Sequence, residues 1–436
     1  MGQREMLWIV YNVLFAFGYA LMLPRFLMRM RRRGGYRRGF LQRLAVYPET
    51  LKTKIRERRR IWVHAVSVGE VYVAMRYMHE IRARRPGTAF VLSATTSTGH
   101  RVAEARLHPD DVLLYYPADF PGIVRHALRA IDPLCLILTE SEIWPNMIRA
   151  SARRGVPVFI VNGRISRSSY RGYRLLKVFF SRIVRMLDLI IVQTERDRER
   201  LIDLGGSAER IVVAGSAKYD VADTAAADAG AVDAVLQRLG WGEPLLLVAG
   251  STWPGEEGIL ADTYARLKQR FPKLRLILVP RHAERCDEVE AAVRGRGLSV
   301  ARRSLLNRPG VSADRADVLL VDTTGELMNF YARGDVVFVG KSLTSHGGQN
   351  IIEPGVLGKP ILVGPNMENF PDVMRDFLDA GALMQVADEA QLESALARLL
   401  GDAAERAALG ERARRLADRK RGAVRSGVSL ILDRLA

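Results

Sequence analysis

The stretch GKSLTSHGGQNIIEPGVLGKP, residues 340 to 360, indicates the fold most directly. It follows an apolar run over residues 335 to 340 that reads as a buried strand. Gly347 and Gly348 come next, and they would let a ligand approach the backbone without interference from a Cβ atom. A helix then begins near Asn350, so the order is strand, glycine-rich loop and helix. This order is typical of a ligand-binding loop in an α/β domain.

The helix after these glycines carries a carboxylate in its first turn. Asn350 can cap the helix, and Glu353 would be placed to accept two ribose hydroxyls while the helix N-terminus faces a phosphate. The same two residues have the spacing of a capping box, so a purely structural surface loop is the alternative. The sequence contains neither a GxxxxGK[ST] phosphate loop nor a GxGxxG fingerprint, so other common nucleotide-binding motifs are excluded.

Apolar, β-branched runs alternate with helix-like segments throughout the chain beyond residue 60. In the first half we predict strands over residues 61–68, 89–96, 111–117, 134–140, 156–163, 188–194 and 211–218. An Ala- and Asp-rich connection follows over residues 220–243, and it is partly helical in composition. The second half gives strands over residues 244–252, 274–281, 317–324, 335–340, 359–365 and 382–388. The pattern predicts two doubly wound domains with ligand-binding loops facing a cleft.

Length and cysteine content are consistent with this organisation. At 436 residues the chain is long enough for two full cores. Its two cysteines, Cys135 and Cys286, exclude a disulfide framework and favour a reducing compartment. No HExxH motif or His/Cys ligand spacing is present, so we predict no metal site, and we interpret His64 as a hydrogen-bonded core residue.

The N-terminus combines an apolar run with a basic one. Residues 6 to 24 are uncharged and slightly short of the usual hydrocarbon thickness of about 30 Å when helical. Many of the arginines that produce the net charge of +18 come directly after this run, over residues 25 to 60. Their position favours a membrane anchor whose C-terminal end stays in the cytoplasm. A cleaved signal peptide or a buried amphipathic helix is the alternative, and whether the segment spans or lies on the membrane is left open.

Acidic residues follow two predicted strands of the first half. Glu70 opens the helix after the first strand, where it is either a general base or an acid that complements the helix dipole. Glu140 and Glu142, in TESEIWPN, would lie on one side of an extended chain, which costs energy unless a cation or a ligand uses them. Candidate cations, which could also form only a solvated basic face, are Arg164, Arg167, Arg171 and Lys218.

Three further loops of the second half point toward an anion. They are GSTWPGEE at residues 250–257, VPRH at 279–282 and DTTGEL at 322–327. The first and last of these loops end at a predicted helix N-terminus, which offers unpaired N–H groups to a negatively charged ligand.

Several blocks, in one order along the whole chain, resemble the 3-deoxy-D-manno-octulosonic acid (Kdo) transferases of lipopolysaccharide synthesis. The blocks are WVHAVSVGEV, TESEIWPN, NGRISRSSYRGY, GSAKYD, VPRH, DTTGEL and GGQNIIEPGVLGKPILVGP. The resemblance implies an inverting, metal-independent GT-B glycosyltransferase without a cofactor. It would move Kdo from CMP-Kdo to a tetraacylated lipid A precursor, lipid IVA, at the cytoplasmic face of the inner membrane, with no nucleic acid as partner.

The resemblance also implies a division of the chain and roles for particular residues. Residues 1–30 would be the anchor and its basic flank, 31–219 the acceptor domain, 220–243 the linker, 244–415 the CMP-Kdo domain and 416–436 a C-terminal helix. Glu70 would be the base, with Glu140 and Lys218 stabilising the transition state. The residues implied to hold CMP are Pro280, Arg281, Gly325, Glu326, Leu327, Asn350, Ile351, Ile352 and Glu353. Gln349, where the family often has His, and Val66, in place of a small residue, depart from the pattern.

Two other functions fit parts of the sequence. A GT-B transferase that uses a UDP- or GDP-sugar would share the two-domain pattern and would prefer UDP or GDP to CMP. A non-catalytic basic protein that binds a membrane surface or nucleic acid would account for the +18 charge. Against nucleic acid, no aromatic residues for base stacking are interleaved with the arginines.

Overall fold

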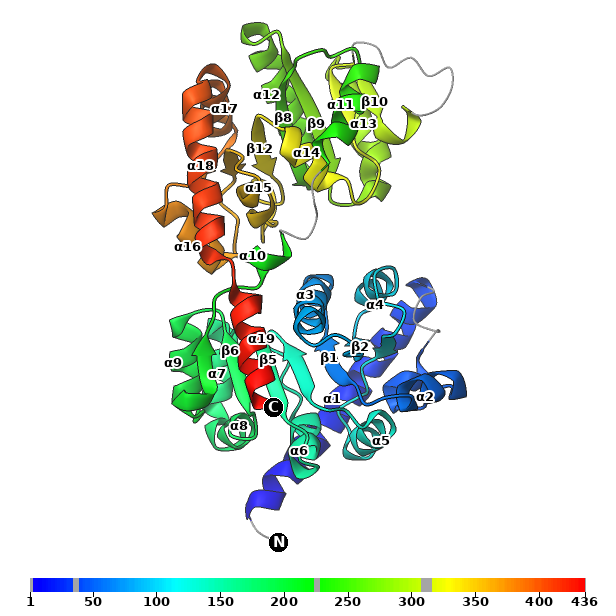
Figure 1. Ribbon diagram of the computed structural model, residues 1–436. Helices are drawn as coiled ribbons and strands as arrows, with labels where there is room; N and C mark the ends of the chain where they lie inside the picture. The colour runs from blue at the N-terminus through cyan, green and yellow to red at the C-terminus, as the bar shows by residue number, and fades with distance from the viewer. Residues whose placement is uncertain (1–2, 34–38, 223–227, 307–315, 436) are drawn as a thin grey trace. The chain divides into compact units, whose positions relative to one another are not determined.

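The computed structural model describes residues 3–33, 39–222, 228–306 and 316–435. The chain forms two compact units, shown in Figure 1. Unit 1 extends from the N-terminus to Val221 and also includes the chain from Arg421 onward, whereas unit 2 is the segment from Ala222 to Lys420. The C-terminal end of the chain therefore returns to unit 1.

Unit 1 is built on a seven-stranded parallel sheet in the order β3-β2-β1-β4-β5-β6-β7. The strands are β1 (Ile61–Ala65), β2 (Phe90–Ala94), β3 (Val112–Tyr115), β4 (Leu136–Thr139), β5 (Val158–Gly163), β6 (Leu189–Val192) and β7 (Ile211–Val213). The helices are α1 (Gln3–Arg33), α2 (Glu49–Arg56), α3 (Val68–Arg84), α4 (Ser97–Glu104), α5 (Pro121–Ile131), α6 (Pro145–Arg153), α7 (Arg167–Leu175), α8 (Lys177–Val184), α9 (Glu195–Asp203), α10 (Lys218–Val221) and α19 (Ala423–Arg434).

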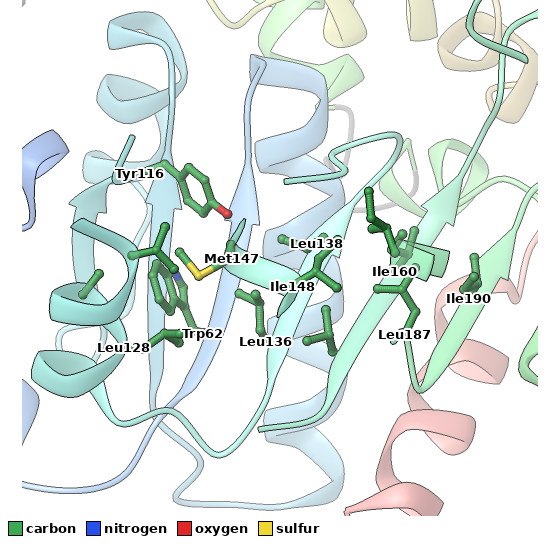
Figure 2. Packing of buried hydrophobic residues seen from close by; sticks show 14 of the residues in the cluster. Trp62, Tyr116, Leu128, Leu136, Leu138, Met147, Ile148, Ile160, Leu187 and Ile190 are labelled. Atoms are coloured by element: carbon green, nitrogen blue, oxygen red, sulfur yellow. The ribbon is translucent and has the colours of Figure 1, made fainter. Parts of the chain in front are cut away.

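Both faces of this sheet are buried, as the continuous apolar runs of the sequence require. Alternate residues of each strand point to opposite faces. Trp62 and Leu136 join α5 and α6 in one core, part of which Figure 2 shows. Ile61 and Ile137 belong to a second core on the opposite face, together with residues of α3 and α19.

Unit 2 has a second seven-stranded parallel sheet in the order β10-β11-β9-β8-β12-β13-β14. The strands are β8 (Leu245–Thr252), β9 (Leu274–Pro280), β10 (Val300–Arg302), β11 (Val318–Leu320), β12 (Val336–Val339), β13 (Ile361–Val363) and β14 (Met384–Gln385). The helices are α11 (Ala229–Arg238), α12 (Glu256–Arg270), α13 (Cys286–Arg294), α14 (Leu327–Arg333), α15 (Ile352–Val356), α16 (Pro371–Asp379), α17 (Glu389–Gly401) and α18 (Ala403–Lys420). Two parallel α/β sheets of this kind confirm the predicted GT-B-like class.

Each of the thirteen predicted strands contains an observed strand, but β10 was not predicted. It is a three-residue strand at the edge of its sheet, too short to give a periodic signal. The prediction of one C-terminal helix over residues 416–436 is wrong, because α18 ends at Lys420 and α19 starts after Gly422, whose φ is 102°. Within the predicted connection over residues 220–243, α11 is helical, and residues 223–227 lie outside the described part.

Helix α1 packs along unit 1 through one stripe of side chains. Trp8 is buried, and the Tyr11 hydroxyl donates to Asp119 Oδ2 at 2.9 Å. Asn146 Nδ2 donates to Asn12 Oδ1 at 2.7 Å. Residues 5–24 form a stretch that is long and apolar enough to cross a membrane, with a mean hydropathy of 1.9 and only 6% of its apolar window buried. This criterion considers length and composition only. Within the Arg-rich run over residues 25 to 60, residues 34–38 lie outside the described residues.

Candidate functional site

Glu70 lies in the first turn of α3, directly after β1. Ser67 caps this helix, because its hydroxyl oxygen accepts from the Glu70 backbone N–H at 3.3 Å. The Glu70 carboxylate accepts from the backbone N–H of Val66 and from the Ser67 hydroxyl, both at 2.8 Å. The Thr139 hydroxyl, at the end of β4, lies 3.3 Å from Glu70 Oε2. The side chain is thus held from two neighbouring strands and is only 7% exposed.

Glu140 follows β4 and lies beside Lys218. Its backbone is in the left-handed region at φ 56°, an uncommon conformation for a residue with a side chain. The Asn162 amide, 3.4 Å from Glu140 Oε1, comes from the end of β5. Lys218 Nζ lies 3.6 Å from the same oxygen. Four segments, β4, β5, α3 and α10, therefore bring Glu70, Glu140 and Lys218 to one edge of the sheet.

Glu142 adds a third carboxylate to this edge. Its Oε2 accepts from the Trp144 indole N–H at 2.9 Å. Burial, reinforced by the negative charges of Glu70 and Glu140, raises the pKa of Glu142 to about 7. Burial also raises the pKa of Glu70 against the opposing effect of its hydrogen bonds, and the Glu140 charge raises it further. A carboxyl group with a raised pKa is a stronger base when ionised, which suits proton abstraction near neutral pH.

His64 is a core residue, as its isolated position on a predicted strand indicated. Its ring is fully buried, stacks on Tyr116 with the ring centroids 3.6 Å apart, and interacts with the Ser93 carbonyl at 3.0 Å. Burial lowers the pKa of His64 to about 3. The neutral imidazole supports β1 and does not supply a charge.

The predicted cations divide into two groups. Lys218 joins the carboxylates, as described above. Arg167 and Arg171 are exposed on α7, and Arg164 lies in the loop before that helix, where its carbonyl oxygen accepts from the Ser141 hydroxyl. These three arginines thus lie on the segment from the end of β5 to α7 of unit 1.

Asn350 and Glu353 interact in unit 2, just before and within α15. Asn350 Nδ2 donates to Glu353 Oε1 at 3.1 Å, and Asn350 Oδ1 accepts from the Ile352 N–H at 3.1 Å. Asn350 lies one residue before the N-cap position, which Ile351 occupies. Removal from water raises the pKa of Glu353, whereas Asn350 and the nearby Arg281 oppose that rise. The prediction that Asn350 caps this helix is therefore wrong, and its side chain instead pairs with one of the two Glu353 oxygens.

The glycines before this helix serve the chain itself, which corrects the expectation that their backbone is bare for a ligand. Gly347 and Gly348 have φ values of 117° and 67°. A Cβ atom on Gly347 would lie 2.6 Å from the Asn369 side chain, and one on Gly348 would lie 2.3 Å from the Met367 sulfur. Positive φ and close packing both require glycine at these positions.

The loop over residues 250–257 also differs from the prediction, since carboxylates rather than a ligand anion occupy it. Glu256, fully buried in the first turn of α12, accepts from the backbone N–H groups of Trp253, Lys341, Ser342 and Leu343. Glu257 accepts from the Arg285 guanidinium at 2.9 Å. Glu256 thus fixes the loop after β12 against the loop after β8, and Glu257 links α12 to the segment after β9.

The remaining predicted donor-site residues end neighbouring strands of unit 2 or open the helices after them. Pro280 is the last residue of β9, and Arg281 is exposed immediately after it. Gly325 has φ 92°, Glu326 accepts from Arg303 Nη2 at 2.8 Å, and Leu327 starts α14. Arg281 thus lies close enough to Glu353 to influence its pKa, whereas Glu326 is already paired with Arg303.

Asn162 is a site residue that the sequence analysis missed. Its Oδ1 accepts from the Ala217 N–H at 3.0 Å, next to Lys218, while its amide reaches Glu140. Its φ of 54° lies in the left-handed region, which Asn tolerates better than most residues, so the NG pair at the end of the fifth predicted strand could have indicated it. Among the described residues, no group of three or more His, Cys, Asp or Glu is arranged to hold a metal ion.

Comparison with known proteins identifies the family. Residues 38–221 match the family model described as 3-deoxy-D-manno-octulosonic-acid transferase (kdotransferase), and residues 313–416 match glycosyl transferases group 1. The 3-deoxy-D-manno-octulosonic acid transferase of Bordetella pertussis is 35% identical over 86% of this chain and 87% of its own length. The Haemophilus influenzae protein of the same name is 30% identical over 85% and 86%.

Solved structures show the same architecture at lower identity. The UDP-GlcNAc 2-epimerase of Neisseria meningitidis superposes with a TM-score of 0.59 over 86% of this chain and all of that chain, at 11% identity, which shows the fold alone. The sequence relatives go further, because they align over most of both chains. The chain belongs to the 3-deoxy-D-manno-octulosonic acid transferase family of glycosyltransferases.

Proposed function

We propose that this protein transfers Kdo from CMP-Kdo to a hydroxyl group of lipid IVA, with inversion at the sugar and without a metal ion. The observation that carries the proposal is the cluster of Glu70, Glu140, Glu142 and Lys218 at one edge of the unit 1 sheet. Membership of the Kdo transferase family supports Kdo as the sugar that is transferred. The apolar helix α1 and the basic chain after it support an acceptor embedded in a membrane.

Glu70 is the general base in this mechanism. Its ionised carboxylate removes the proton from the acceptor hydroxyl as that oxygen attacks the anomeric carbon of Kdo. The bond from that carbon to the CMP phosphate breaks, CMP leaves with the electron pair, and the new C–O bond forms on the opposite face. A single displacement of this kind inverts the configuration. The Val66 N–H and the Ser67 hydroxyl hold the carboxylate in place before the reaction.

Lys218 and Glu140 act as a pair on the charge that develops during transfer. The Lys218 ammonium group stabilises negative charge, and Glu140 orients it from 3.6 Å while stabilising positive charge on the sugar. Asn162 positions both residues through its side-chain amide. In this proposal the Lys218 cation takes the role that a metal ion has in other transferases.

Unit 2 binds the nucleotide in the proposed reaction. Glu353 accepts the ribose hydroxyls, with Asn350 holding one of its oxygens, and Arg281 contacts the phosphate. Pro280, the turn of Gly325, Glu326 and Leu327, and the pair Ile351 and Ile352 complete the CMP site. The anchor helix α1 attaches the protein to the cytoplasmic face of the inner membrane.

The test is transfer in a defined mixture. The purified protein is incubated with lipid IVA and CMP-Kdo that is generated in situ, EDTA is added before the transfer step, and the lipid is weighed by mass spectrometry. We expect a gain of one or more Kdo masses, and the number of Kdo masses gives the number of additions. No gain, with a known Kdo transferase active in parallel, would overturn the proposal, and parallel reactions with UDP- and GDP-sugars would identify another donor.

A further inference from the structure

Unit 1 contains an apolar cavity of about 500 Å³ beneath α1. On one side its lining is one stripe of α1 that includes Phe15, Gly18 and Tyr19. On the other side are Tyr116 and Ala118, after β3, and Trp144, before α6. A cavity of this volume with a mostly apolar lining and few polar groups is typical of a small-ligand site.

The cavity lies next to the carboxylate cluster of the same unit. Trp144 lines it and donates its indole N–H to Glu142 at 2.9 Å. Tyr116 lines it as well, with its ring 5.5 Å from the Trp144 ring. Whatever enters the cavity therefore lies one side chain away from Glu142 of the carboxylate cluster.

The surface that the cavity offers to a ligand is mostly apolar. Tyr116 and Thr95 line the cavity, and their hydroxyl groups have no hydrogen-bond partner among the described residues. Both hydroxyl oxygens are covered by the surrounding protein, so the cavity presents the apolar parts of these side chains. A ligand with an apolar body therefore fits this lining.

The cavity also reaches the apolar outer face of α1. Leu14 and Met22 line the cavity and are 65% and 70% exposed, so they belong to both surfaces. Val13, Phe17 and Leu21, on the same helix, are exposed by 61% or more. This face is suited to contact with the hydrocarbon of a bilayer, from which a lipid chain can enter the cavity without crossing water.

We infer that this cavity holds one acyl chain of the lipid acceptor and so places the acceptor's headgroup at the carboxylate cluster. The inference rests on the proposed function, because that function supplies an acylated acceptor. The cavity then favours acceptors that carry an acyl chain close to the reacting sugar. Arg43, another lining residue, has its guanidinium fixed by the Thr95 carbonyl at 2.7 Å and adds positive charge for an anionic headgroup.

Gly18 makes the cavity testable without disturbing the core. A Cβ atom at Gly18 would meet no described atom within 4 Å, so a larger side chain can extend into the cavity. The test compares Gly18→Phe with Ala20→Phe, which adds the same side chain to an exposed position of the same helix that does not line the cavity. Gly18→Leu is the second variant if Gly18→Phe does not fold.

The first readout is binding of tetradecyl phosphate by calorimetry, below the concentration at which it forms micelles. We expect the full-length wild-type protein and Ala20→Phe to bind about one molecule with equal affinity, and Gly18→Phe to bind at least tenfold more weakly. Equal affinity in all three proteins, or equal loss in both variants, would overturn the inference, because binding would then occur on the outer face of α1.

The second readout separates this inference from the proposed function. Transfer to lipid IVA is compared with transfer to the same headgroup from which the acyl chains have been removed. Gly18→Phe should lose most of its rate with lipid IVA and retain the wild-type rate with the deacylated acceptor. A similar loss with both acceptors would overturn the acyl-chain assignment. Absence of transfer by the wild type would overturn the proposed function, while the calorimetry would still decide whether the cavity binds a chain.

Discussion

Glu70 and Glu256 have corresponding places in the two units but different surroundings. Each lies in the first turn of the helix that follows the first strand of its sheet, and each is buried. Glu256 accepts four backbone N–H groups, which hold its two oxygens in the fold. Glu70 accepts one backbone N–H and interacts with two hydroxyls. Burial and the Glu140 charge raise the pKa of Glu70, and burial and the Glu70 charge raise the pKa of Glu142.

This difference shows that burial at a helix N-terminus does not by itself make a catalytic base. The Glu256 carboxylate ties two loops together, and its partners are backbone amide groups, which do not ionise near neutral pH. The partners of Glu70 leave it close to Glu140 and Glu142, an arrangement that costs stability and that a substrate proton and Lys218 can offset.

After Glu70 itself, the largest effect is expected at Lys218, the cation beside the carboxylates of unit 1. We expect Lys218→Met to lower kcat about 10²-fold, because a fixed charge that stabilises the transition state is removed. The measurement is the single-turnover rate of transfer, followed by mass spectrometry of the lipid. Lys177→Met is the matched control, since Lys177 forms a 3.1 Å pair with Asp203 on the surface of the same unit and should retain the wild-type rate. Equal rates for the two variants would contradict the role of Lys218.

Glu256→Ala should act on stability instead. Four buried N–H groups would lose their acceptor, so we expect the free energy of unfolding to fall by at least about 3 kcal/mol. Urea unfolding measures this loss, with Glu70→Gln as the comparison, because glutamine keeps hydrogen-bond capacity and removes a charge from the cluster. The contrast fails if Glu256→Ala is as stable as the wild type.

The strand pattern and the position of Glu70 could be predicted because both depend on residues close in sequence. The role of Glu256 could not, since its partner Lys341 is 85 residues away and binds through its backbone. Gly347 and Gly348 were assigned to a ligand for the same reason: their neighbours Met367 and Asn369 come from a later loop. The loops that carry the candidate residues could therefore be predicted from the sequence. The residues that each loop contacts come from distant parts of the chain and could be found only from the structure.

Glu142→Gln should change how stability depends on pH. Because the folded-state pKa of Glu142 is about 7, above the ordinary carboxyl value of 4.5, the wild type gains stability from the protonated form. That contribution is present at low pH and is lost as the pH rises through about 7. We therefore expect the free energy of unfolding of Glu142→Gln to exceed that of the wild type by about 1–3 kcal/mol at pH 8, with a smaller difference at pH 5. Urea titrations at the two pH values measure this, and a gain confined to pH 5 would contradict it.

The smallest effect is expected at the attachment of α1. Tyr11→Phe removes the hydrogen bond to Asp119 and keeps the ring, so we expect a loss of about 1 kcal/mol. Hydrogen exchange of the amides in α1 should become faster, while α3 exchanges as before. Tyr19→Phe, on the same stripe, is the control. Unchanged exchange in α1 would mean that the Tyr11 hydroxyl does not contribute to holding this helix on unit 1.

The central claim, that Glu70 is the base of a Kdo transfer reaction, is tested most directly by the single-turnover rate of Glu70→Gln with CMP-Kdo and lipid IVA. We expect a loss of about 10³-fold with CMP affinity unchanged, because general-base catalysis is removed while unit 2 is intact. Transfer at a rate near that of the wild type by the folded variant would contradict the claim and would assign proton abstraction to another group.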